Sequence, residues 1–62
     1  MMEDQLRQLL KDRGWNLFSR TVSNKQYFYA QKWRMGEIYI APAAKLEQVT
    51  EDQVLAKLAK IK

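Results

Sequence analysis

The chain of 62 residues is long enough for one small domain, and its 11 Lys plus Arg against 7 Asp plus Glu give a net charge of +4. A domain of this size buries only about 60% of the surface that its unfolded chain exposes, which leaves no room for an enclosed substrate cavity. Because the chain has neither Cys nor His, it lacks disulfides and the usual ligands of zinc, iron-sulfur and haem sites.

The same absences bear on catalysis. The two residue types that most often serve as nucleophile or as general base near neutral pH are missing, and the two glycines form no phosphate-binding loop. We therefore expect a protein that is not an enzyme and carries no metal or cofactor.

The apolar stretch over residues 38–44 is far shorter than the about 20 residues of a membrane span, and the N-terminus lacks the pattern of a secretion signal. We expect a soluble, cytoplasmic protein without a membrane partner.

Residues 2–13 have the pattern of a short amphipathic helix. Apolar side chains recur on one side at helical spacing, namely Met2, Leu6, Leu9 and Leu10. Glu3 and Asp4 lie in the first turn and Arg13 in the last, as the helix dipole favours, and Gly14 provides a left-handed residue to end the helix.

The next segment has the composition of β-strands, rich in Trp, Phe, Tyr, Val, Thr and Ile. We predict three antiparallel strands over residues 15–22, 26–34 and 37–41. Residues 23–25 form the first turn and Met35-Gly36 the second, a tight hairpin in which Gly36 takes the positive φ. Pro42 ends the third strand because it has no N–H for the ladder.

A second helix is predicted over residues 51–61, after a loose helical turn at residues 43–48. Thr50 and Gln53 form a capping box, and Val49 and Val54 occupy the positions of a hydrophobic staple. The apolar residues Val54, Leu55, Leu58 and Ile61 then recur at helical spacing. The predicted fold class is α+β: one domain with an N-terminal helix, a three-stranded meander and a C-terminal helix packed on the sheet.

The expected turns fix which side chains share a face of the sheet. A two-residue turn at Met35-Gly36 pairs Arg34 with Glu37, so that one face, the expected core, holds Tyr27, Tyr29, Trp33, Ile38 and Ile40. The opposite face then holds Phe28, Ala30, Lys32, Arg34 and Tyr39. A three-residue first turn adds Trp15 and Leu17 to the core face and Phe18, Arg20 and Val22 to the open one, whereas a turn of two or four residues swaps them. In an alternative arrangement the two helices cover opposite faces, and Phe28 and Tyr39 are then core residues.

The positive charge is concentrated in the first two strands. Residues 13–34 contain five basic residues and no acidic ones, interleaved with six aromatic residues. Phosphate groups attract such a surface, and exposed rings stack on bases, although a run of charge is also common on a merely solvated surface. The candidate nucleic-acid contacts are Arg20, Lys25, Lys32, Arg34, Phe28 and Tyr39.

The segment from Lys25 to Leu58 resembles the small arm-binding N-terminal domains of phage and transposon integrases, which are similar to plant AP2-type domains. The resemblance lies in the order of the elements and in the aromatic and basic hairpin KQYFYAQKWRMGEIYI, residues 25–40, followed by a capped helix. It implies a three-stranded sheet that is backed by the C-terminal helix and laid in the major groove of DNA. The implied strand contacts are Arg20, Lys32, Arg34 and Tyr39.

Two functions follow as hypotheses. The first is a non-enzymatic nucleic-acid-binding module that uses a basic and aromatic sheet face, with DNA expected rather than RNA and with single strands suited to exposed rings. The alternative is a protein-interaction adaptor or a homodimer, because so small a fold often completes its core with a partner. Phosphate binding weakens steeply with salt and an apolar interface does not, which separates the two.

Overall fold

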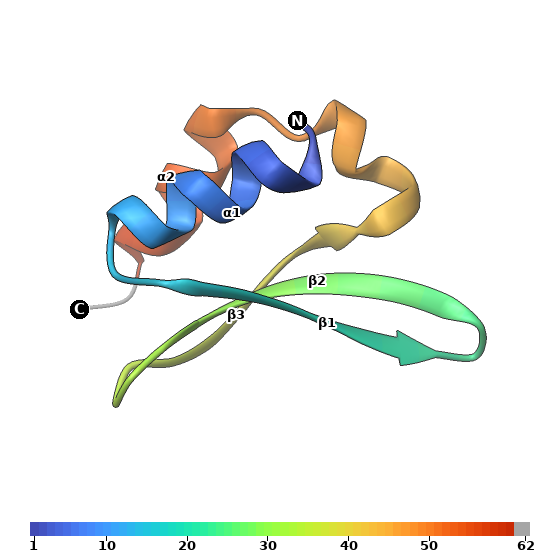
Figure 1. Cartoon of the computed structure of the whole chain (residues 1–62), viewed down its shortest axis with the longest axis horizontal. Helices are drawn as coiled ribbons and strands as arrows, with labels where there is room; N and C mark the ends of the chain where they lie inside the picture. The colour runs from blue at the N-terminus through green and yellow to red at the C-terminus, as the bar shows by residue number, and fades with distance from the viewer. Residues whose placement is uncertain (61–62) are drawn as a thin grey trace.

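The computed structural model describes residues 1–60 and confirms the predicted α+β arrangement (Figure 1). Helix α1 (Glu3–Asp12) leads into a sheet of β1 (Asn16–Val22), β2 (Lys25–Lys32) and β3 (Gly36–Pro42). A 3-10 helix, η1 (Ala43–Gln48), and helix α2 (Glu51–Ala59) complete the chain. The predicted core position Ile61 lies outside the described residues.

The molecule has two layers. Within residues 1–60, all helical segments lie on one face of the antiparallel sheet, whose strand order is β1-β2-β3, and no helix lies over the other face (Figure 1). The alternative in which the helices cover opposite faces is therefore wrong.

The helix ends follow the local signals of the sequence. At the start of α2 the Thr50 hydroxyl accepts a hydrogen bond from the Gln53 N–H, and the Gln53 side chain accepts one from the Thr50 N–H, each at 3.2 Å. At the end of α1, Gly14 adopts φ +82°, and its N–H donates to the Lys11 carbonyl at 3.0 Å. Both ends thus satisfy backbone groups that the helices leave free.

The first hairpin has a shorter turn than predicted. Only Ser23 and Asn24 connect the strands, because both adopt positive φ, 52° and 65°, as a two-residue hairpin turn requires. Val22 therefore pairs with Lys25 and Leu17 with Ala30.

The second hairpin has a longer turn than predicted. Its three residues are 33–35, and the Met35 N–H donates to the Lys32 carbonyl at 3.0 Å. Arg34 adopts φ +65°, while Gly36, at φ +97°, already belongs to β3 and pairs with Lys32. The predicted pair of Arg34 with Glu37 is wrong, and Gln31 faces Glu37 instead.

These two changes reverse the faces of β2 alone. The first turn is one residue shorter than predicted and the second is one residue longer, so each reverses the facing of β2 relative to its neighbour. The facing of β1 relative to β3 is therefore as predicted, and Leu17 and Ile40 do lie on the core side. In β2, however, Phe28 and Ala30 are buried against the helices, and Tyr27 and Tyr29 lie on the open face. The predicted core residue Trp33 is in the turn and is 82% exposed.

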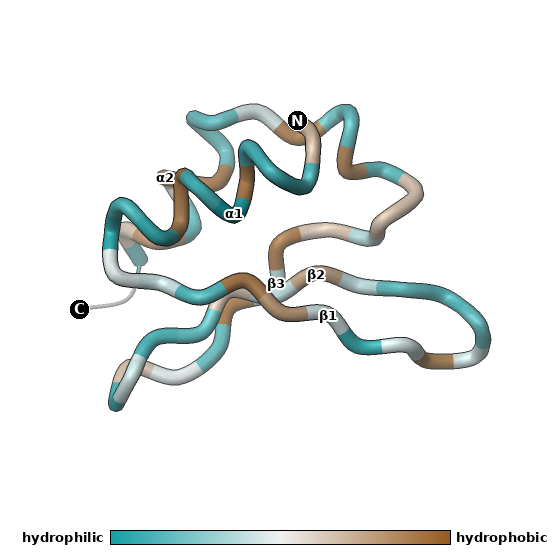
Figure 2. The backbone as a smooth tube through the Cα atoms, viewed as in Figure 1, coloured by the Kyte–Doolittle hydropathy of each residue, from teal (hydrophilic) through white to brown (hydrophobic). Residues whose placement is uncertain are grey.

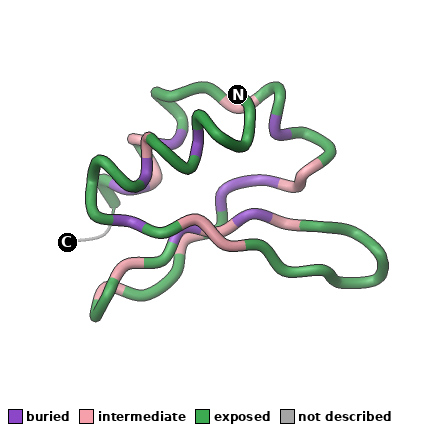
Figure 3. Tube along the Cα trace, in the orientation of Figure 1, coloured by how far each residue is buried: buried purple, intermediate pink, exposed green. Residues whose placement is uncertain are grey.

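The core fills the space between the two layers. Buried and apolar segments of the helices and of the sheet face each other there, whereas the β1–β2 hairpin end is exposed and the β2–β3 hairpin end is exposed in part (Figures 2 and 3). An irregularity in the β2–β3 register directs the consecutive residues Ile40 and Ala41 into this core. The buried side chains are Leu6, Leu10, Trp15, Phe28, Ala30, Ile40, Ala41, Leu46, Val54 and Leu58.

Candidate functional site

The helix-free side of the sheet presents a cluster of aromatic rings, which we call the open aromatic face. It consists of Phe18 from β1, Tyr27 and Tyr29 from β2, and Tyr39 from β3, with Arg20 and Glu37 at its sides. Phe18, Tyr27 and Tyr29 are half-buried by one another, and Tyr39 is 44% exposed. Alternating residues of a strand point to the same side, which is why this spacing brings the rings together.

The rings contact one another across all three strands. Phe18 and Tyr29 are stacked, with centroids 5.4 Å apart and an interplanar angle of 18°. Tyr39 meets Tyr29 edge to face at 5.6 Å, and it meets Tyr27 in a tilted arrangement at 6.2 Å. These distances lie in the range of favourable aromatic pairs, so the rings form one packed platform across the three strands.

Arg20 lies diagonally over this platform. Its guanidinium carbon is 5.2 Å from the centroid of Phe18 and 5.0 Å from that of Tyr29. Its Nη2 donates to both carboxylate oxygens of Glu37, at 2.8 and 2.9 Å. The side chains of this pair are 51% and 36% exposed, so the pair contributes about 1 kcal/mol or less, and a competing anion could displace the carboxylate.

Lys57 of α2 reaches the rim of the open aromatic face at the β3 edge. Its ammonium group lies 5.4 Å from the Tyr39 centroid and donates to the Ile40 carbonyl at 2.7 Å. In the sequence, Lys57 was recognisable only as a basic residue near the C-terminal end of the second helix. Its contact with Tyr39 and Ile40 of β3 could not be predicted from that position. Loss of contact with water raises the pKa of the Tyr39 hydroxyl above its usual value. Repulsion from the hydroxyls of Tyr27 and Tyr29 raises this pKa further, and Tyr39 is neutral at pH 7.

The predicted contact residues do not form a single surface. Arg20 and Tyr39 belong to the open aromatic face, as expected, whereas Lys25 starts β2 and Arg34 lies in the second turn. Phe28 was predicted to be an exposed stacking residue, which is wrong because it is only 4% exposed on the helical side.

Lys32 is likewise not on the open side. It shares the helix-facing side of β2 with Phe28, and its ammonium lies 5.5 Å from the centroid of the buried Trp15. The predicted trio of Arg20, Lys32 and Arg34 on one face is therefore wrong. The predicted contacts did not include Phe18, Tyr27, Tyr29, Glu37 and Lys57, although Phe18 was expected on the open face. A two-residue first turn, signalled by Ser23-Asn24, groups Phe18 with Tyr27 and Tyr29 on one face, and the three-residue second turn adds Tyr39 to that face.

Charge is distributed unevenly between the two layers. The sheet with its turns, residues 16–42, contains four basic residues and one acidic residue. The remaining described residues, 1–15 and 43–60, contain six of each. The positive excess of the described residues thus belongs to the layer that carries the open aromatic face.

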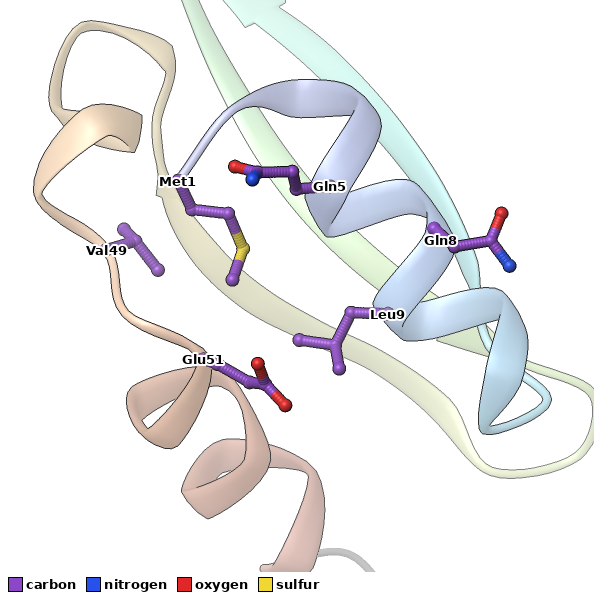
Figure 4. Close-up of a pocket in the computed structure, with 6 residues that line it drawn as sticks. All are labelled: Met1, Gln5, Gln8, Leu9, Val49 and Glu51. Carbon is purple, nitrogen blue, oxygen red and sulfur yellow. The ribbon is translucent and has the colours of Figure 1, made fainter.

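The helical layer has a cleft of a different character. It measures about 500 Å³ and runs between α1 and the segment from η1 to α2, where Met1, Leu9 and Val49 approach one another (Figure 4). The polar side chains along it are Gln5, Gln8 and Glu51. The Met1 ammonium is already bound to the Leu46 and Glu47 carbonyls, each at 3.0 Å. A lining with one carboxylate and no Lys or Arg side chain does not suit a phosphate-bearing ligand.

Over residues 1–60 there is no group of three acidic residues placed to hold a metal ion, and no helix is long and apolar enough to cross a bilayer. No protein-family model, no curated protein and no solved structure matches the chain.

Proposed function

We propose that this protein is a non-enzymatic module that binds single-stranded nucleic acid, with DNA as the expected ligand, on the open aromatic face. The observation that carries the proposal is the packed cluster of Phe18, Tyr29 and Tyr39, with the Arg20 guanidinium over Phe18 and Tyr29, on the positively charged layer of the molecule. Proteins that bind single strands combine these two features, stacking rings and a cationic surface.

Stacking supplies affinity with little sequence preference. Each base stacked on an aromatic side chain contributes about 1 to 3 kcal/mol, and every base has a face to stack. Tyr39 is the most exposed ring of the open aromatic face, so it is the first position for a base. The planar guanidinium of Arg20 can stack on a base or, after leaving Glu37, pair with a phosphate.

The surrounding cations suit the strand backbone. Arg20 lies on the open aromatic face, Lys57 lies at its β3 rim, and Arg34 and Lys25 lie at the two ends of β2. Single strands lose affinity with a log-log salt slope of about −0.7 for each neutralised phosphate, so four neutralised phosphates correspond to a slope of about −3.

A titration of fluorescein-labelled dT12, followed by anisotropy over a range of salt concentrations, tests the proposal, with rU12 and a 12-base-pair duplex as competitors. The double variant Arg20→Gln/Arg34→Gln should weaken binding at least tenfold. The matched control Lys11→Gln/Lys60→Gln removes equal charge from the helical layer and should weaken it only slightly. Equal losses in the two double variants would indicate unspecific attraction to a basic protein, and tighter binding of the duplex would reject the single-strand proposal.

The adaptor hypothesis remains the competitor because of one observation. Trp33 is 82% exposed at the tip of the β2–β3 hairpin, and Trp, Tyr and Arg are the residue types that dominate protein interfaces. If wild type binds none of the oligonucleotides at low salt but self-associates or binds a protein with little dependence on salt, the adaptor function is supported and the nucleic-acid function is rejected.

A further inference from the structure

A second cleft lies at the end of the sheet near the β1–β2 turn, and we call it the lysine cleft. It measures about 450 Å³, and its walls include Asn24, Lys25, Tyr27, Pro42 and Lys45. The cleft exists because β3 ends at Pro42, opposite Tyr27, and the chain then continues into η1. The first two residues of β2 therefore have no β3 partner beside them, which leaves a recess between β2 and η1.

The charges around this recess indicate an anionic ligand. Two lysines, Lys25 and Lys45, line it, and no acidic residue does among residues 1–60. Within residues 1–60, the ion pairs are Arg7 with Glu3 and Arg20 with Glu37, so neither Lys25 nor Lys45 is neutralised by a described acid. Two cations that share one recess repel each other, and an anion between them removes that repulsion.

Tyr27 connects the lysine cleft to the open aromatic face. Tyr27 lines the cleft, and its ring centroid lies 6.2 Å from that of Tyr39. A strand stacked on Tyr39 therefore passes from β3 to the neighbouring ring of Tyr27 on β2 and reaches the cleft there. Pro42 and Ala43 give the recess an apolar wall against which a sugar can pack.

We propose that the lysine cleft binds a backbone phosphate of the strand held on the open aromatic face, between the ammonium groups of Lys25 and Lys45. This inference rests on the proposed function and extends it, because it assigns one end of the path that the nucleic acid follows. The cleft between α1 and α2 is of similar size, but its lining includes the Glu51 carboxylate and no Lys or Arg side chain, so it suits a phosphate less well (Figure 4).

The test compares Lys25→Gln/Lys45→Gln with the helical-layer control Lys11→Gln/Lys60→Gln, using labelled dT12 and thermal melting. Both lysines of the cleft are exposed, so the melting temperature should stay close to that of wild type. The cleft variant should bind dT12 several-fold more weakly, with a salt slope shallower by about 0.7 for each phosphate that the lysines no longer neutralise. The charge-preserving variant Lys25→Arg/Lys45→Arg should restore the affinity.

A second readout locates the ligand. In a nitrogen-15 NMR titration with dT12, the backbone amides of Asn24, Lys25 and Lys45 should shift together with that of Tyr39. If wild type binds dT12 but these three amides do not shift, or if the cleft variant behaves like the control, this inference is overturned and the proposed function stands. If wild type does not bind dT12, the proposed function fails and the inference fails with it.

Discussion

Arg20 and Glu37 lie on the two outer strands of the sheet, and the Arg20 Nη2 spans the middle strand to donate to the carboxylate at 2.8 Å. The contact is diagonal, because Arg20 pairs with Tyr27 in the ladder whereas Glu37 pairs with Gln31. The guanidinium is thereby held over Phe18 and Tyr29. Glu37 thus positions the cation and, at the same time, occupies the Nη2 group with which Arg20 would bind a phosphate.

Glu37→Gln should therefore strengthen nucleic-acid binding. The change removes the only acid in the sheet and its turns and frees the Arg20 donors, so we expect several-fold tighter binding of dT12. The pair is exposed, so the free energy of unfolding should fall by about 1 kcal/mol or less. Anisotropy and urea denaturation measure the two effects, and weaker binding by this variant would contradict the view that Glu37 competes with phosphate.

Arg34→Gly should separate stability from binding. Arg34 adopts φ +65°, a conformation that costs a non-glycine residue about 1 to 2 kcal/mol, so glycine should stabilise the fold by about 1 kcal/mol or less once its own chain entropy is included. The same change removes a proposed phosphate contact, so binding should weaken.

Arg34→Ala is the matched control for this position. It keeps the backbone strain and loses the charge, so it should weaken binding without stabilising the fold. If both variants bind dT12 as wild type does, Arg34 is not a phosphate contact.

Lys57→Met should promote self-association. In the structure the Lys57 ammonium donates to the Ile40 carbonyl at 2.7 Å and so blocks the outer edge of β3. Methionine keeps an apolar stem of similar length but leaves this carbonyl without a hydrogen bond from residue 57. The sheet then has an open edge at β3 as well as at β1, so β1 of one copy can pair with β3 of the next in an open-ended chain. Sedimentation velocity should show oligomers that grow with concentration, and Lys60→Met should not; equal behaviour of the two variants would mean that Lys57 does not protect the edge.

The docking of α2 is tested by two substitutions of unequal cost. Thr50→Ala removes the hydroxyl that accepts from the Gln53 N–H and should cost about 1 kcal/mol of unfolding free energy, whereas Thr50→Ser should retain most of it. Val54→Ala should cost about 2 kcal/mol, because Val54 is fully buried in the core. Urea denaturation measures both, and an unchanged stability in Val54→Ala would show that α2 is not docked on the sheet.

The sequence by itself determined the elements, their order and the ends of the helices, as well as the end of β3 at Pro42. Gly14, the Thr50–Gln53 box and Pro42 act on backbone groups within a few residues of themselves, so their effects can be recognised locally. Amphipathic spacing likewise identified the buried sides of both helices, including Leu6 and Val54.

Only the tertiary structure decided which face of β2 is buried. Both faces of that strand carry aromatic or apolar side chains, so its alternation alone does not distinguish them, and one residue in the length of a turn reverses every side chain. Ser23, Asn24 and Arg34 accept positive φ, which sets the turns at two and three residues, and the packing of the helices against Phe28 and Ala30 agrees with that register. The positions of Tyr27 and Tyr29 on the open aromatic face, and the contacts of Arg20 with Glu37 and of Lys57 with β3, depend on strands and helices that meet only in the folded chain.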